Sequence, residues 1–595
     1  MRFTLVLAAA VVSAQAESQP TKAAKDLKQN VETPIELRTV VTWDEECLKQ
    51  GGAVKSTAVK KAAKVMLVAL SDDATTTKDP VSGEFTTEEV EAGEELKSAL
   101  VNKKVDHKAK NTLVRTFVEE ADSEVEKATK RRLLVETTDD GRRRLSEKES
   151  AFQKRDEVIG VLKAFSKGME KAGVGKDDDD GEFFGHIGVD VLPANRDGKQ
   201  IIAKTAQMMP CVKFAEQELP REPLGTQNDV NTIYDHLDHD WWVHSYYHGD
   251  PVSTFQWYFG ANPGVGHLKT MEYLKKKGIT IPEGLPVAVV DAECNYNFED
   301  INWEVNEDEI PDNGKDDDNN NIVDDYKGYV GPFSSSSSFS LSILLVSCFS
   351  CVFYICCQDF GGGDSDTSVK SGKPHGSTVS AIIAAKSYNK CKIVCYKAAR
   401  QGVLYTSLIL KAINAIIDRG DIRVSNHSYG GFGPLQSEFQ AFKKLDSSGH
   451  LIVTAAGNSG CDMTTSNSCN SNGVAMVPAM YDLQNIVSVG AIDINNMLSW
   501  FSNYGDNVVD LWAPGNIIVA FNSPQSPVFH FSRGTSYAAP IVTGAAALAM
   551  SLDPNLSGSK VRQLLYSTSR VTHADQTTWG AHGQLDMLQL IKAIV

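Results

Sequence analysis

The pattern of hydrophobic and polar positions changes near residue 246. Beyond it, short apolar runs alternate with longer segments of helical periodicity. The apolar runs predict buried strands at LPVAVVD (285–291), KIVCYKA (392–398), LIVTAAGN (451–458) and NIVSVGAID (485–493). The periodic segments predict helices at 375–387, 404–420, 435–449 and 534–552. Nearly continuous apolar strands separated by helices are typical of a parallel sheet covered on both faces, so we expect an α/β fold here.

The preceding part of the chain has a different texture. Residues 17–220 are rich in Lys and Glu, with periodic apolar positions. Near its end, 183–195 predicts a strand, 198–209 a short helix and 210–218 a second strand, which indicates a smaller α+β unit. Two basic clusters, Lys130–Arg132 and Arg142–Arg144, fit processing sites and solvated surface equally well.

The N-terminal residues and the formal net charge bear on where the protein is located and which partners it can bind. Residues 1–16, MRFTLVLAAAVVSAQA, have one early Arg, an apolar core and an A-x-A ending, which predicts a signal peptide; a short N-terminal anchor is the alternative. A signal peptide implies a secreted, extracellular protein whose cysteines can pair. The formal net charge of −17 argues against a nucleic-acid partner.

Four polar residues lie at the ends of predicted elements. Asp291 ends one strand, His375 precedes a helix, Asn458 follows another strand and Ser536 begins the last long helix. Taken singly, they are ordinary turn, surface or capping residues. Because chemistry in parallel sheets gathers at the carboxyl ends of the strands, their joint order suggests a nucleophilic site in which Asn458 donates to an oxyanion.

The surrounding motifs resemble the subtilisin-like serine proteases. They are VAVVDAECNYNFEDI around Asp291, HGSTVSAI at His375, VSNHSYGG, AAGNSG at Asn458 and GTSYAAP at Ser536, and the similarity extends over most of residues 250–570. The resemblance implies a parallel-sheet catalytic domain and a serine endopeptidase with an Asp291–His375–Ser536 triad and an Asn458 oxyanion donor. It further implies that Ser428, Tyr429 and Gly430 pair with a peptide or protein substrate and that Ala455, Ala456 and Gly457 wall its main pocket.

The resemblance also gives a domain plan. After the signal peptide (1–16), it implies a propeptide region (17–220) with an inhibitor-like and chaperone-like part at about 150–220, a linker and maturation region (221–250) and a catalytic domain (251–595). The propeptide is then an intramolecular inhibitor, and the maturation cut falls between about Pro220 and Pro251. No membrane span is expected in the mature chain.

Three residues depart from the family's motifs. Glu293, Thr378 and Arg533 replace its usual glycine, second histidine and asparagine. Glu293 puts a bulky carboxylate where a compact turn is expected, which bears on the basicity of His375. A weakened or inactive peptide-binding protein is therefore the alternative function. A third, a membrane-anchored protease, depends wholly on the apolar segment at 330–358.

Further candidates concern calcium, disulfides and glycans. The acidic stretch 312–325 has the spacing of a calcium loop, although a solvated acidic loop is the alternative. Its predicted ligands are Asp316, Asp318, Asn320, Ile322 and Asp325. Cys461 and Cys469 flank a short polar loop and are the predicted disulfide, whereas Cys391 and Cys395 share one strand, where pairing is awkward. Of the sequons at Asn426 and Asn555, only Asn555 suits a glycan.

The segment 330–358 does not fit this plan. It is uncharged and contains a serine run and a cysteine-rich apolar run. It is long enough to span a membrane but lacks flanking basic anchors. Its Phe, Ser, Leu and Cys codons are rich in pyrimidines, Val330 is encoded by GTN and Gln358 can be CAG, so we interpret it as a retained intron.

We therefore predict that transcripts join the codons of Tyr329 and Asp359 in frame. Sequencing the message across this junction tests the interpretation. A tryptic peptide that contains the serine run would contradict it.

Overall fold

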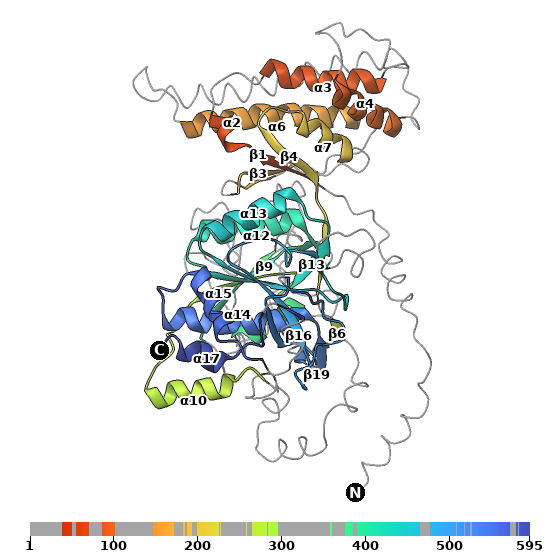
Figure 1. Cartoon of the computed structure of the whole chain (residues 1–595). Coiled ribbons are helices and arrows are strands. Elements are labelled where there is room, and N and C mark those ends of the chain that lie inside the picture. The colour runs from red at the N-terminus through yellow and green to blue at the C-terminus, as the bar shows by residue number, and fades with distance from the viewer. Residues whose placement is uncertain are drawn as a thin grey trace, which may run out of the picture.

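A computed structural model gives the fold of the chain (Figure 1). It describes residues 38–49, 55–70, 86–100, 147–171, 182–184, 187–192, 199–224, 226–227, 258, 264–282, 284–294, 357–359, 375–384, 390–400, 402–464, 476–506, 508–516, 518–523, 526–571, 579–580 and 582–595.

A parallel sheet forms the centre of the C-terminal part. Its strand order is β17-β16-β14-β12-β7-β9-β8, and every neighbouring pair is parallel. The bounds are β7 Pro286–Asp291, β8 Cys357–Asp359, β9 Lys392–Lys397, β12 Val424–His427, β14 Leu451–Ala455, β16 Ile486–Ile492 and β17 Leu511–Pro514. The four strands predicted from apolar runs are confirmed as β7, β9, β14 and β16.

Helices cover both faces of this sheet. Val287 and Val289 of β7 belong to one buried cluster with α11 (His375–Ala384) and α14 (Thr535–Leu552). The alternate residues Ala288 and Val290 belong to another, with α12 (Thr406–Arg419) and α13 (Gln436–Ser447). Strand alternation thus divides β7 between two cores, and the predicted α/β fold is confirmed. Helices α10 (His267–Lys277), α15 (Gly558–Ser567) and α17 (Met587–Lys592) lie on the α11–α14 side.

Helix α14 is the described helix that is long and apolar enough to cross a membrane. It is 94% buried inside the protein, as expected of a core helix in a soluble fold. Of the segment 330–358, the structure describes Cys357 and Gln358, which begin the edge strand β8 beside β9.

An N-terminal module comprises the described residues between 38 and 218. Its antiparallel sheet has the order β2-β3-β1-β4. The strands are β1 Thr39–Trp43, β2 Glu182–Phe184, β3 Val189–Leu192 and β4 Val212–Gln217. Five helices lie on the side of this sheet that faces away from the large sheet (Figure 1): α2 (Glu45–Lys49), α3 (Lys55–Leu70), α4 (Thr87–Leu100), α6 (Glu147–Lys171) and α7 (Lys199–Gln207). Within the module, Cys47 is disulfide-bonded to Cys211.

Two sequence predictions for this module need correction. The single strand predicted at 183–195 is a hairpin of β2 and β3, in which Phe184 pairs with Val189. Gly188 in its turn has φ +65°, a conformation that favours glycine. In addition, β1 is an interior strand that pairs with both β3 and β4, so the folded unit begins by Thr39 and not near residue 150.

The module's sheet rests on α12 and α13 (Figure 1). Val40, Val189 and Val191 belong to the same buried cluster as Leu408 of α12 and Phe442 of α13. Polar contacts fix the position of this apolar interface. The Glu216 carboxylate accepts the backbone N–H groups of Gln436 (2.9 Å) and Ser437 (2.8 Å), where a helix start leaves donors free.

Candidate active site

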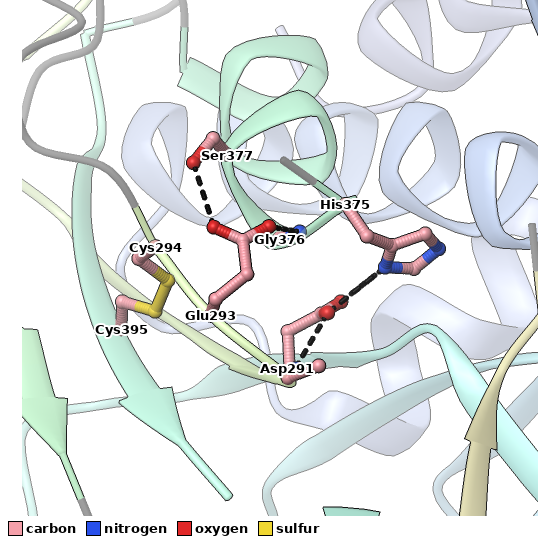
Figure 2. Close-up of a disulfide and its surroundings, with 8 residues drawn as sticks. Asp291, Glu293, Cys294, His375, Gly376, Ser377 and Cys395 are labelled. Atoms are coloured by element: carbon pink, nitrogen blue, oxygen red, sulfur yellow. Dashed lines mark hydrogen bonds and ion pairs between the residues drawn. A yellow bond between two sulfur atoms is a disulfide. The ribbon is translucent and has the colours of Figure 1, made fainter. Parts of the chain in front are cut away.

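Asp291 and His375 meet at the carboxyl edge of the large sheet. Asp291 is the last residue of β7 and is fully buried, and His375 is the first residue of α11. His375 Nδ1 lies 2.8 Å from Asp291 Oδ1 and 3.0 Å from Oδ2 (Figure 2). Because a carboxylate only accepts, Nδ1 carries the proton and Nε2 is left as the basic nitrogen.

A glycine makes this approach possible. A Cβ added to Gly376 would lie 1.9 Å from the Glu293 backbone oxygen and 2.9 Å from Asp291 Cβ. Any side chain at position 376 would therefore push α11 away from β7 and separate the histidine from the aspartate.

Ser536 lies in the first turn of α14, two residues after Gly534. Its hydroxyl donates to the Ser428 backbone oxygen at 2.8 Å. In the described part of the chain His375 Nε2 has no hydrogen-bond partner, so the structure brings Asp291 and His375 together without a Ser536–His375 bond. The Tyr537 ring lies beside the imidazole, with 5.5 Å between centroids.

Asn458 is held in one orientation by Thr535. Its side-chain oxygen accepts from Thr535 N at 2.9 Å and from Thr535 Oγ1 at 3.0 Å. The amide nitrogen is therefore directed the other way and donates to the Leu224 backbone oxygen. Ser536 N donates to the same oxygen at 3.0 Å. Two donors thus converge on one peptide carbonyl, which is the arrangement that stabilises an oxyanion.

The chain that carries Leu224 runs through the site as an added strand. Strand β5 (Pro220–Pro223) lies between β11 (Val403–Tyr405) and β13 (Tyr429–Phe432), antiparallel to both. Within it, Pro223 pairs with Tyr429 and Glu222 with Gly430. Next along the chain, Leu224 N donates to Ser428 O at 3.0 Å. The three residues predicted to pair with substrate thus pair here with the protein's own segment.

On the other side of Leu224 the chain continues in strand β6 (Thr226–Gln227). It pairs antiparallel with β19 (Ser526–Arg533), Thr226 opposite Arg533. Arg533, one of the three motif departures noted in the sequence, therefore flanks the segment downstream of Leu224, and its guanidinium lies 5.1 Å from the Trp500 ring centroid.

The Leu224 side chain is buried, being 8% exposed. A Cβ on Gly430 would approach Leu224 Cδ1 to 2.9 Å, and Ala455 belongs to the same buried cluster. Ala456 is also buried, and Gly457 has φ +107° with its N–H donated to Thr535 Oγ1 at 3.0 Å. The predicted pocket residues 455–457 therefore lie between the end of β14 and the start of α14.

Glu293 has a structural role that sequence reasoning missed. Its carboxylate accepts from Gly376 N at 2.8 Å and from Ser377 Oγ at 3.2 Å, so it caps α11 directly after His375 (Figure 2). Burial raises the pKa of the Glu293 carboxyl to about 8, and the nearby Asp291 charge adds to the rise. The expected steric conflict of this residue with the turn is thus replaced by a cap.

The disulfides differ in part from the prediction. Cys294, adjacent to Glu293, is bonded to Cys395 of β9 and ties the end of the Asp291 segment to the neighbouring strand (Figure 2). Sequence spacing gave no signal for this pair, which is 101 residues apart. Cys391 is buried and is not bonded to Cys395, whose partner is Cys294, in agreement with the awkward Cys391–Cys395 pairing. Cys461 is disulfide-bonded, and its predicted partner Cys469 lies outside the described residues.

The two sequon asparagines have defined positions, whereas the predicted calcium ligands do not. Asn426 is fully buried and donates to Ser428 Oγ at 2.8 Å, which leaves no room for a glycan, whereas Asn555 is exposed. The predicted calcium ligands at 316–325 lie outside the described residues, and the described residues contain no cluster of three or more His, Cys, Asp or Glu side chains suited to a metal.

Comparison with known proteins gives a consistent result. Residues 283–584 match the sequence model of the subtilase family. Subtilisin-like protease 3 of Plasmodium falciparum (isolate 3D7) is 31% identical over 37% of this chain and 31% of its own length, and Subtilisin DY of Bacillus licheniformis is 38% identical over 27% and 55%. Subtilisin Savinase of Lederbergia lenta is 32% identical over 34% of this chain and 73% of its own length. The chain therefore spans less than two thirds of the first two relatives.

A solved structure shows the same fold. Fervidolysin from Fervidobacterium pennivorans, described as a keratinolytic enzyme related to subtilisin, matches with a TM-score of 0.50 and 19% identity. The match covers 74% of this chain and 59% of that one.

The cap on α11 predicts a pH-dependent stability. Because the folded-state pKa of Glu293 is raised from 4.5 to about 8, its contribution to stability is fully present below pH 4.5 and is lost as the pH rises through 8. We expect the Tm to fall between pH 5 and pH 9, and to fall less in Glu293→Gln, which keeps an acceptor but cannot ionise.

The exposed Glu272→Gln in α10 is the matched control, and its Tm should follow the wild type. Thermal unfolding followed by circular dichroism at a series of pH values measures the effect. An identical pH slope in Glu293→Gln and wild type would contradict the assignment.

Proposed function

The chain belongs to the subtilase family, and on that premise we propose that it is a secreted serine endopeptidase made as a self-inhibited precursor. One observation carries the proposal: the Leu224 carbonyl oxygen lies between the N–H of Ser536 and the side-chain amide of Asn458. A peptide bond held in this way by two donors is positioned for attack by the Ser536 hydroxyl.

The proposed reaction uses the named groups in sequence. Ser536 Oγ exchanges its bond to Ser428 O for one to His375 Nε2, which takes the hydroxyl proton as Oγ bonds the carbonyl carbon. Asn458 and the Ser536 N–H stabilise the negative charge on the carbonyl oxygen. The C–N bond breaks as His375 returns the proton to the leaving amine, and water then hydrolyses the acyl-enzyme by the same route. Asp291 holds the tautomer and stabilises the imidazolium.

The same geometry defines the proposed maturation site. Because Leu224 supplies the polarised carbonyl, the cut falls between Leu224 and Gly225, within the predicted range 220–251. The module's docking contacts, among them the cap of Glu216 on α13, then keep the new carboxyl terminus in the cleft as a product-like inhibitor. The leader at 1–16 supplies the secretion part of the proposal.

Labelling with a fluorophosphonate probe tests the activity. We expect the secreted wild-type chain to be cut, to begin at Gly225-Thr226-Gln227 on N-terminal sequencing, and to be labelled at Ser536. Ser536→Ala should remain uncut and unlabelled, since it lacks the attacking oxygen.

Ser551→Ala is the control, because Ser551 lies on the same helix and its hydroxyl bonds only the Ala547 backbone oxygen among the described contacts. It should mature and label as the wild type does. A folded wild-type chain that stays unlabelled would instead favour the peptide-binding alternative, for which the free His375 Nε2 is the relevant observation.

Calcium is part of the proposal on the sequence alone. The loop 312–325 offers hard oxygen ligands at calcium-loop spacing. A ligand at a hundred times its Kd stabilises a folded state by about 2.7 kcal/mol, so chelation should lower the Tm measurably and added calcium should restore it. The Tm of Asp318→Asn should be less sensitive to chelation than that of the wild type. A wild-type Tm that does not change on chelation would contradict the proposed calcium site.

A further inference from the structure

Arg221 is a fully buried cation in β5, the strand that occupies the cleft. Its side chain and that of Glu438 are both 0% exposed, with Arg221 Nη2 2.6 Å from Glu438 Oε2 and Nε 3.3 Å from Oε1. Nη2 also donates to the Gly433 backbone oxygen at 3.0 Å. This is a forked guanidinium–carboxylate pair, the geometry in which arginine is recognised most specifically.

The position of Arg221 relative to the proposed cut is fixed by β5. Leu224 supplies the carbonyl between the oxyanion donors, so Arg221 is the fourth residue upstream of the bond that breaks. In the same strand Glu222 is exposed, as strand alternation requires. Of the two charged residues of β5, Arg221 is thus the one whose charged end enters the protein.

The groups that receive Arg221 all belong to the catalytic part. Glu438 lies in the first turn of α13, and Tyr481 Oη donates to its Oε2 at 2.8 Å. A Cβ added to Gly431 would lie 3.1 Å from Arg221 Cδ, so the glycine leaves room for the arginine stem. These groups stay with the enzyme after the module and β5 leave.

Removal of Arg221 would leave Glu438 as a buried carboxylate with one neutral hydroxyl donor. A buried charge without a counter-charge is costly. Burial alone would lower the pKa of the Arg221 guanidinium, but the charge and hydrogen bond of Glu438 outweigh burial and raise that pKa. A substrate that returns a guanidinium to this place regains the interaction, whereas a neutral residue leaves the carboxylate unpaired.

We propose that Glu438, oriented by Tyr481, forms a specificity pocket that selects arginine at the fourth position before the cleaved bond in substrates. The inference rests on the proposed peptidase function and names its substrate class: peptides of the form Arg-x-x-Leu, of which Arg-Glu-Pro-Leu at 221–224 is the internal example.

The test uses three fluorogenic peptides that differ only at this position. They are the acetylated Arg-Glu-Pro-Leu, citrulline-Glu-Pro-Leu and Ala-Glu-Pro-Leu amides, assayed with enzyme produced and matured from the full chain. Citrulline has the shape of arginine without its charge. We expect kcat/KM for the arginine peptide to exceed that for the citrulline peptide by about 10- to 100-fold, as for a hydrogen bond between charged groups.

Equal hydrolysis of all three peptides would overturn the pocket while leaving the peptidase function intact, and would make the Arg221–Glu438 pair an anchor for the module alone. Hydrolysis of none would overturn the peptidase function and this inference with it.

Glu438→Gln tests the carboxylate directly. In this variant the ratio of kcat/KM for the arginine peptide to kcat/KM for the citrulline peptide should fall to about 1. Asp421→Asn, which removes an exposed charge beside Arg419, is the matched control and should keep the preference. Since Glu438→Gln leaves Arg221 unpaired in the precursor, the double variant Arg221→Gln, Glu438→Gln provides the same measurement with neutral partners. An arginine preference that survives in either variant would overturn the proposal.

Discussion

The carbonyl oxygen of Leu224 is the point on which the arrangement of the cleft depends. Ser536 N and the Asn458 amide both donate to it, which sets the register of the whole segment along the site. Once this residue is fixed, Pro223 must face Tyr429 and Arg221 must reach Glu438, because each residue of an extended strand advances by about 3.3 Å. A slip by one residue would expose Arg221 and bury Glu222.

Charged side chains of the module and of β5 pair with groups on the C-terminal part of the chain. Arg221 meets Glu438, Glu216 meets the start of α13, and the buried Glu218 meets Arg400 at 3.0 Å. Such contacts add position more than affinity, since desolvation offsets much of their attraction. Burial of the apolar surface around Val40 and Phe442 provides the attraction between the two parts. The charged pairs form in one relative orientation of the parts and so select that orientation.

The sequence predicted what depends on local pattern and missed what depends on distant partners. Asp291, His375, Asn458 and Ser536 could be located because apolar runs define the element ends at which they lie and because the short motifs around them resemble those of subtilisin-like proteases. The cap formed by Glu293 could not be predicted, because it forms only if α11 lies close to β7, and Gly376 permits that close approach. The pair of Arg221 and Glu438, 217 residues apart, likewise becomes visible only when the cleft is assembled.

Because β8 lies at an edge of the large sheet, the sheet tolerates a change in the residues that precede Asp359. Cys357 and Gln358 occupy positions opposite Cys395 and Tyr396, and a backbone ladder is made of amide and carbonyl groups that every non-proline residue carries. If the chain were joined at Tyr329 and Asp359, two other residues would precede Asp359, and they would carry the same backbone groups. The backbone ladder of the sheet can therefore be completed equally well by the longer and the shorter polypeptide.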